Sequence, residues 1–309
     1  MDYAAVRAAL FVAPPAGTSE PDVVRHASPA RRLRDAFEPI AMHQVWSPSV
    51  AAALAEAADL AFFASYVWGR AAVLGNVEPL VAASAFAVFE PSVIAAQMRA
   101  GQQAISGDEI LSVLDRSTIT SLAGVIDPAD AEEVVLVAGL LREAVDAADG
   151  TGRPLFCGVR ALGWPDDAVG QLWRACHALR EHRGDTHTAA FVAAGMDPVR
   201  MNILTELWIG YQLGGYSTSR AWGPDVTAAA LTRLRLDGLI QGEGDATQLT
   251  VAGRARRDEI ESATDRGQQD IVDRLGDRLD SVVDALQRWS ALCISRGMFP
   301  PDLRKRAGG

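Results

Sequence analysis

Hydrophobic residues along most of this chain recur every three or four positions, the spacing that places them on one face of an α-helix. The pattern predicts helices over residues 28–37, 49–72, 77–88, 91–100, 107–125, 128–148, 165–182, 185–194 and 198–213. Residues 13–25 are rich in Pro, Gly and Ser, so we expect residues 1–26 to form a flexible leader. A Gly- and Pro-rich stretch at 150–154 predicts a linker that ends a helical N-terminal lobe, residues 27–150.

The second half of the chain shows a different order of elements. A helix is predicted over 224–239, two short strands over 239–241 and 248–250, and a further helix over 251–264 that Thr250 caps. Helix, β-hairpin and helix in this order are typical of the end of a winged helix-turn-helix domain. We therefore expect a mainly α protein, in which a multi-helical N-terminal lobe packs on a winged helix-turn-helix-like domain with a small β wing.

The domain expected to carry the wing spans residues 151–270, and residues 271–309 are expected to form a C-terminal helix and tail. The first of these also holds residues 179–187, Leu-Arg-Glu-His-Arg-Gly-Asp-Thr-His, which place two histidines, two arginines and two carboxylates around one glycine. We call this stretch the histidine box. Gly184 is expected to end one helix and Asp185 to cap the next, so that the ionisable side chains meet at a helix-helix corner.

Two interpretations of the histidine box stay open. In the first, His182 or His187 is a catalytic general base, and Asp185 orients it. In the second, Asp185 only caps a helix, while the nearby arginines and histidines only interact with the helix dipole. A metal, if present, would be held by His182, His187, Asp185 and His43, although their spacing matches no standard metal site.

A ligand pocket is expected between the two lobes, and its candidate ligand-binding residues are His43, Arg70, Arg183, Arg220 and Trp222. Arg70 ends an otherwise apolar helix, so it needs Asp185, another carboxylate or an anionic ligand as its partner. Arg220 and Trp222 either cap the pocket or fasten the turn before the wing helix. The sequence contains no nucleophile elbow, dinucleotide-binding turn or phosphate-binding loop. It therefore predicts no particular cofactor. A heme with a histidine ligand is one alternative.

The charge distribution disfavours DNA as a partner. The chain has a net charge of −10 and a pI near 5.0. Residues 224–265 hold five arginines against eight acidic residues, and the tip of the wing carries Glu243 and Asp245. Because phosphate neutralisation supplies most nonspecific affinity, we expect weak or no DNA binding.

The location expected for this protein is the cytoplasm. The longest apolar stretch, 54–74, contains Glu56, Asp59 and Arg70, which favours a buried helix over a membrane span. The N-terminus lacks the pattern of a signal peptide. The three cysteines are odd in number and lie in apolar surroundings, which is typical of reduced thiols.

Several motifs resemble those of a large actinobacterial family of helix-turn-helix proteins of unknown function. They are Glu38-Pro39 with His43, Arg70-Ala71-Ala72 with Gly75, the histidine box, Arg220 with Trp222, and Thr264-Asp265. The resemblance covers about residues 38–290, although Val45-Trp46 departs from it, and residues 231–254 are similar to MarR-type regulators. It implies a shared pocket and no particular activity. We therefore expect binding of a small anionic or aromatic metabolite, with an enzyme or a ligand-responsive MarR-like regulator as the alternatives.

Overall fold

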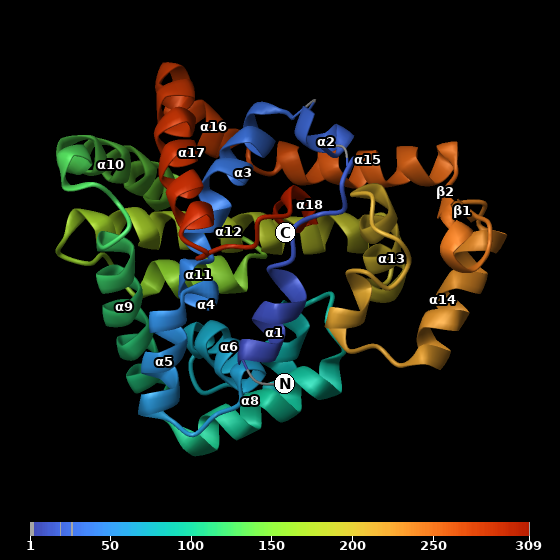
Figure 1. Ribbon diagram of the computed structural model, residues 1–309, viewed down its shortest axis with the longest axis horizontal. Helices are drawn as coiled ribbons and strands as arrows, with labels where there is room; N and C mark the ends of the chain where they lie inside the picture. Colours follow the sequence, from blue (N-terminus) through green and yellow to red (C-terminus); the bar gives the residue numbers. More distant parts are fainter. Residues whose placement is uncertain (1–2, 19, 26, 309) are drawn as a thin grey trace.

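The computed structural model describes residues 3–18, 20–25 and 27–308, and it is mainly α-helical, as predicted (Figure 1). The longer helices of the first half are α3 (Pro29–Ala41), α5 (Pro48–Ala57), α6 (Phe62–Ala71), α8 (Pro91–Ala104), α9 (Gly107–Ala123) and α10 (Ala131–Ala147). Those of the second half are α12 (Ala168–Ala193), α13 (Pro198–Trp208), α14 (Pro224–Leu236), α15 (Val251–Arg266) and α17 (Leu279–Ser295). The shorter ones are α1 (Tyr3–Leu10), α2 (Asp22–Arg25), α4 (His43–Trp46), α7 (Pro79–Ala85), α11 (Pro154–Ala161), α16 (Gln269–Leu275) and α18 (Leu303–Gly308).

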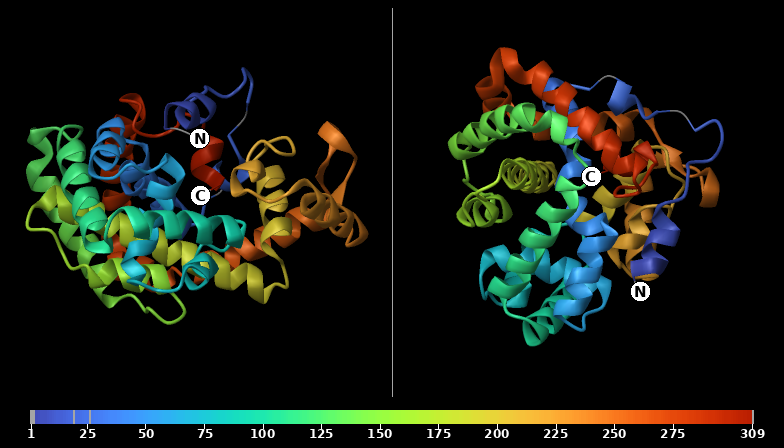
Figure 2. Two further views of the ribbon diagram at one scale, coloured as in Figure 1. Left: turned by 90° about the horizontal axis from the view of Figure 1, so that it is seen from below. Right: turned by 60° about the vertical axis from the view of Figure 1, so that its left-hand side comes forward.

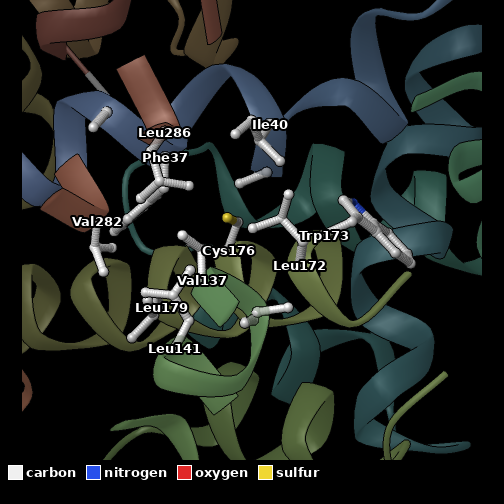
Figure 3. Close-up of a cluster of buried hydrophobic side chains, with 14 of the residues drawn as sticks. Phe37, Ile40, Val137, Leu141, Leu172, Trp173, Cys176, Leu179, Val282 and Leu286 are labelled. Atoms are coloured by element: carbon white, nitrogen blue, oxygen red, sulfur yellow. The ribbon is translucent and has the colours of Figure 1, made fainter. Parts of the chain in front are cut away.

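Helix α12 lies at the centre of the molecule, with α3, α10 and α11 packed around it, while α17 packs on α3 (Figure 1). It begins where Asp167 accepts the backbone N–H of Gly170 at 2.7 Å, as an N-cap does. Leu172, Cys176 and Leu179 recur at helical spacing and point into the core shown in Figure 3. Because α10, before residues 150–154, and α12, after them, share this core, the two lobes are packed together.

A second core is formed by the helices between α5 and α9. The sequence predicts one helix over 49–72, but the structure breaks it between Ala57 and Phe62, where Ala58 is extended. The break turns α6 back onto α8, so that Trp68 covers Gly101 and the two helices share one core. A Cβ on Gly101 would lie 2.3 Å from the Cβ of Trp68, so only glycine permits this approach. Tertiary packing here outweighs local helix propensity.

The predicted wing is confirmed. Strands β1 (Ile240–Gln241) and β2 (Gln248–Leu249) pair antiparallel, with Ile240 opposite Leu249. Gly242 has a φ of 81°, and a Cβ there would lie 2.2 Å from the carbonyl oxygen of Ala246, so the turn requires glycine. Helices α13, α14 and α15 enclose a separate small core, and α14 projects with the wing from the rest of the molecule (Figure 2).

The N-terminal segment, for which the sequence predicts a flexible leader, contains the short helices α1 and α2. Within it, α1 packs on α4. The Tyr3 hydroxyl donates to the carbonyl oxygen of Trp46 at 2.5 Å, and Arg7 donates to the same oxygen at 2.9 Å. The rings of Phe11 and Trp46 lie 5.8 Å apart. Aromatic contacts and backbone hydrogen bonds therefore hold this helix, while residues 1, 2, 19 and 26 lie outside the described residues.

Within the described ranges, no single helix is long and apolar enough to cross a membrane. Two segments, 29–57 and 62–74, meet the length and composition test only together, across a 90° bend.

Candidate functional site

The histidine box lies inside one continuous helix, so the predicted helix-helix corner is wrong. Helix α12 runs for 26 residues, and Gly184 sits within it rather than at an end. A glycine in a helix interior costs about 1 kcal/mol. The packing of α12 against α3, α10, α11 and α15 outweighs this cost.

Helical geometry then sends the side chains of the box in three directions. His182 and Asp185, three positions apart, face α11. Arg183 and His187, four positions apart, face α15. Glu181 faces α6. The predicted meeting of His182, Asp185 and His187 in one catalytic cluster therefore does not occur, because successive residues of a helix are turned by about 100°.

On the α11 side, His182 and Asp185 have separate structural partners. The Nδ1 atom of His182 lies 3.0 Å from Oε1 of Gln268, and its ring meets Phe156 edge to face. Asp185 accepts the backbone N–H of Phe156 at 3.1 Å and so caps α11 instead of a helix of its own. Burial, together with the nearby carboxylate of Glu181, raises the pKa of Asp185 to about 7 despite that hydrogen bond.

On the α15 side, three guanidinium groups surround Glu261. Arg31, Arg183 and Arg257 lie 2.8, 2.5 and 2.8 Å from its carboxylate oxygens. Burial raises the pKa of Glu261, but these cations hold it well below the usual range. His187 stays neutral beside them, because burial and the guanidinium of Arg257 lower its pKa to about 3. Arg183 is therefore part of a buried network that joins α3, α12 and α15, and the prediction that it binds ligand is not supported.

Arg70 is paired with Glu181, not with Asp185. Its Nε lies 3.0 Å from Oε1 and its Nη2 lies 2.7 Å from Oε2, a bidentate geometry. Arg180 donates to the same carboxylate at 2.9 Å and to Glu38 at 3.3 Å. Burial raises the pKa of Glu181, but Arg70 and Arg180 hold it at about 2. A buried arginine-carboxylate pair thus joins α6 to α12. This agrees with the alternative in which the partner of Arg70 is a carboxylate other than Asp185.

This ion pair forms the polar end of a small pocket, which we call the Arg70 pocket. Its volume is about 30 Å³. The walls are mostly apolar and comprise Met42, Gln44, Val45, Ala51, Leu54, Phe62, Ser65, Tyr66, Gly69 and Leu114, with Arg70, Arg180 and Glu181 at the polar end. Beside this end, Oε2 of Glu38 and both ring nitrogens of His177 are buried without a hydrogen-bond partner among the described residues. Buried polar atoms are rarely left without a hydrogen-bond partner.

His177 and Glu38 are the residues that the sequence analysis missed. His177 stands four positions before Glu181, and its Nε2 lies 3.8 Å from Oε1 of that residue. Its ring stacks on Trp173, and burial lowers its pKa to about 3. The i, i+4 spacing of His177 and Glu181 was the available signal. Glu38, in contrast, comes close to Arg180 only because α3 packs on α12.

His43 lies apart from the Arg70 pocket. It is fully buried, its Nε2 is 2.8 Å from Oγ of Ser121, and its Nδ1 is 3.8 Å from Sγ of Cys293. Burial lowers its pKa to about 4, so the ring is neutral. The predicted pocket that His43 and Arg70 would line together is therefore not assembled.

Arg220 and Trp222 fasten the turn before α14. The indole N–H of Trp222 donates to the carbonyl oxygen of Val88 at 2.9 Å. The guanidinium of Arg220 lies 4.6 Å from the ring centre of Phe89. The backbone carbonyl oxygen of Arg220 accepts the N–H of Glu90 at 3.0 Å. These contacts agree with a structural role for both residues rather than with ligand binding.

Among the described residues, no three His, Cys, Asp or Glu side chains are arranged to hold a metal ion. The four residues proposed as metal ligands, namely His43, His182, Asp185 and His187, contact different neighbours on α9, α11, α15 and Gln268.

Helix α14 and the start of α15 expose apolar side chains. Val226 and Leu236 are 46% and 77% exposed, and Val251 at the start of α15 is 90% exposed. Both arginines of α14 also form contacts within the molecule. Arg233 pairs with Asp237 at 3.1 Å, and Arg235 donates to the carbonyl oxygen of Gly242 at 3.1 Å.

Comparison with known proteins gave one family. No curated protein and no solved structure matches the chain significantly. A family model described as "Helix-turn-helix family" matches residues 30–300, which include the central helix, the Arg70 pocket and the wing. By this match over most of its length, the chain belongs to the helix-turn-helix family.

Proposed function

We propose that this protein binds a small anionic or aromatic molecule in the Arg70 pocket, and that its winged domain binds DNA weakly or not at all. The observation that carries the proposal is the composition of the pocket. Apolar and aromatic walls end at two guanidinium groups, those of Arg70 and Arg180. Small-molecule sites have this character, with a few polar groups that fix orientation within an apolar cavity.

The unpaired atoms next to the pocket support the same proposal. Glu38 and His177 lack hydrogen-bond partners for three buried polar atoms. A ligand that carries both an acceptor and a donor would pair with some of them and with Arg70. The volume of about 30 Å³ is that of a water-sized space, so a larger ligand enters with a change in the side chains at the mouth. Gln44, Phe62 and Tyr66, which are only half-buried, are suited to such movement.

The surface of the winged domain supports the second part of the proposal. Base recognition in the major groove needs polar or basic side chains on the recognition helix. Helix α14 presents Val226 and Leu236 outward, and Arg233 and Arg235 have intramolecular partners. The segment before α14 is only a 3₁₀ turn, Ser217–Arg220, where a helix-turn-helix motif usually has its first helix. A ligand-responsive regulator is the alternative that the family membership favours.

The ligand part can be tested with benzoate, which combines an aromatic ring with one carboxylate, and with the uncharged benzyl alcohol. Titration calorimetry on the full chain should show saturable binding of benzoate and much weaker binding of benzyl alcohol. Arg70→Lys keeps the charge but removes the bidentate geometry, so benzoate affinity should fall about tenfold or more. Arg99→Lys, at an exposed site, is the control and should bind like the wild type. Equal affinity in the wild type and in Arg70→Lys would contradict the proposal.

The DNA part is tested separately by fluorescence anisotropy with a labelled duplex from the gene's own upstream region. At physiological salt we expect no sequence preference over a random duplex. Tight binding of the upstream duplex, without similar binding of the random duplex, would overturn the proposal of weak or no DNA binding. It would favour the ligand-responsive regulator instead.

A further inference from the structure

A groove on the opposite side of α5 from the Arg70 pocket shares no lining residue with it. Its volume is about 750 Å³, within the range of small-molecule sites. It lies between α5 and α9, next to the end of α17. The lining residues are Ser49, Ala53, Glu56, Ala57, Val113, Arg116, Ser117, Thr120, Ser121, Gly124, Val125, Arg296 and Met298. We call it the α5–α9 groove.

The groove has an excess of positive charge, although the chain as a whole carries −10. Arg116 and Arg296 stand against one acid, Glu56. Arg116 donates to the hydroxyl of Ser112, and Arg296 donates to the carbonyl oxygen of Gly124. No carboxylate of the described residues forms an ion pair with either guanidinium, so both keep N–H groups and charge for a ligand.

Hydroxyl groups line the wall that α9 provides. Arg116, Ser117, Thr120 and Ser121 follow the i, i+1, i+4, i+5 spacing that places them along one face of the helix. Thr120 and Arg116 are both exposed. Ser117 donates its hydroxyl hydrogen to the carbonyl oxygen of Val113 at 2.7 Å, and Ser121 is bonded to His43 and to two other serines. Thr120 therefore provides the hydroxyl donor of this face, beside the guanidinium of Arg116.

A buried network holds this wall in place. Oγ of Ser121 lies 2.8 Å from Nε2 of His43, 2.8 Å from Oγ of Ser47 and 2.9 Å from Oγ of Ser49. His43 and Ser47 are fully buried, so they fix Ser121 and Ser49 from behind. The polar wall is thus pre-organised rather than formed by surface side chains alone. This arrangement also gives His43 a role as a positioning residue.

We propose that the α5–α9 groove binds a phosphate monoester with a small apolar body. Two guanidinium groups match the double negative charge, and the hydroxyl of Thr120 supplies a further donor for the terminal oxygens. Ala53, Val113, Val125 and Met298 provide apolar walls for the rest of the molecule. Glu56, an exposed residue of the lining, would repel a ligand that carries a second anionic group.

The test is titration calorimetry of the full chain with phenyl phosphate, compared with phenol as its uncharged counterpart. Wild-type protein should bind phenyl phosphate saturably and phenol at least about tenfold more weakly. Arg116→Gln and Arg296→Gln, both at exposed positions, should each weaken phenyl phosphate binding about tenfold or more, because each removes a charge-assisted contact. Arg256→Gln on α15 removes one positive charge elsewhere and should change the affinity less than about twofold.

The two sites can be told apart in the same experiment. Arg70→Lys should leave phenyl phosphate binding unchanged, since Arg70 does not line the groove. Unfolding curves of every variant check that it is folded. The proposal is overturned if the wild type shows no saturable binding of phenyl phosphate, if phenol binds equally well, or if both arginine variants bind like the wild type.

Discussion

Acidification to pH 5 should destabilise this protein strongly, and His177→Phe should remove part of that effect. His43, His177 and His182 are buried, and burial lowers their pKa values to about 4, 3 and 4. In the unfolded chain they titrate near 6.5. Between about pH 6.5 and pH 4 the unfolded state therefore binds more protons than the folded state. Stability is lost as the pH falls through this window.

The magnitude follows from these pKa values. From pH 7 to pH 5, each of these histidines lowers the free energy of unfolding by about 2 kcal/mol, and so does His187, whose pKa is lowered to about 3. Together the four lower it by about 8 kcal/mol. Asp185 acts in the opposite direction, because its folded pKa is raised to about 7 and the folded state takes up its proton first. It restores about 2 kcal/mol over the same interval. The expected net loss is about 6 kcal/mol, a large part of the stability of a typical protein.

His177→Phe is the sharpest variant, because both ring nitrogens of His177 lack hydrogen-bond partners and its ring stacks on Trp173. Phenylalanine keeps the stacking, so unfolding in urea at pH 7 should change by less than about 1.5 kcal/mol. The difference in stability between pH 7 and pH 5 should shrink by about 2 kcal/mol. His182→Phe is the control: it should shrink that difference equally, but lose about 1 to 3 kcal/mol at pH 7 with the Gln268 contact. An unchanged pH dependence in His177→Phe would refute the reasoning.

Two further substitutions test the packing around the central helix. Glu261→Gln leaves three buried guanidinium groups short of one negative charge and should cost about 3 to 5 kcal/mol in urea unfolding. The matched change Glu133→Gln, in an exposed pair, should cost less than about 1 kcal/mol, and similar costs for both would contradict the role given to Glu261. Gly184→Ala should raise stability by about 0.5 to 1 kcal/mol, because its Cβ would lie no closer than 4.0 Å to Arg70 and Glu181. Gly101→Ala should instead be destabilising, because Trp68 occupies that space, and a loss of stability in Gly184→Ala would show that α12 needs a glycine there.

The wing was predictable because its signals are local. Gly242 permits the turn, and Thr250 accepts the N–H of Gly253 at 3.0 Å to begin α15. Neither feature depends on distant parts of the chain. The continuity of the central helix was not predictable in the same way, because glycine, here Gly184, commonly ends helices. Only the burial of α12 on several sides keeps the helix continuous there.

The sequence predicted that Arg70 has an acidic partner, but not which residue that partner is. An arginine at the end of an apolar helix must find an acidic partner, and Arg70 does. Which carboxylate it meets depends on the direction in which α12 turns its side chains, and a helix that continues through Gly184 directs Glu181 rather than Asp185 toward it. One error about helix continuity therefore changed the partner of Arg70 and dispersed the predicted histidine cluster.

The Arg70 pocket and the winged domain are joined by one aromatic cluster, which consists of Phe63, Tyr66, Phe86 and Phe89. Arg70 lies 4.7 Å from the ring centre of Phe86, and Arg220 lies 4.6 Å from that of Phe89. A ligand that drew Arg70 away from Glu181 would therefore disturb the cluster that holds the turn before α14. Contact alone is not coupling, since coupling needs two arrangements that the ligand distinguishes. The Arg70 pocket and the turn before α14 thus contact the same cluster of rings.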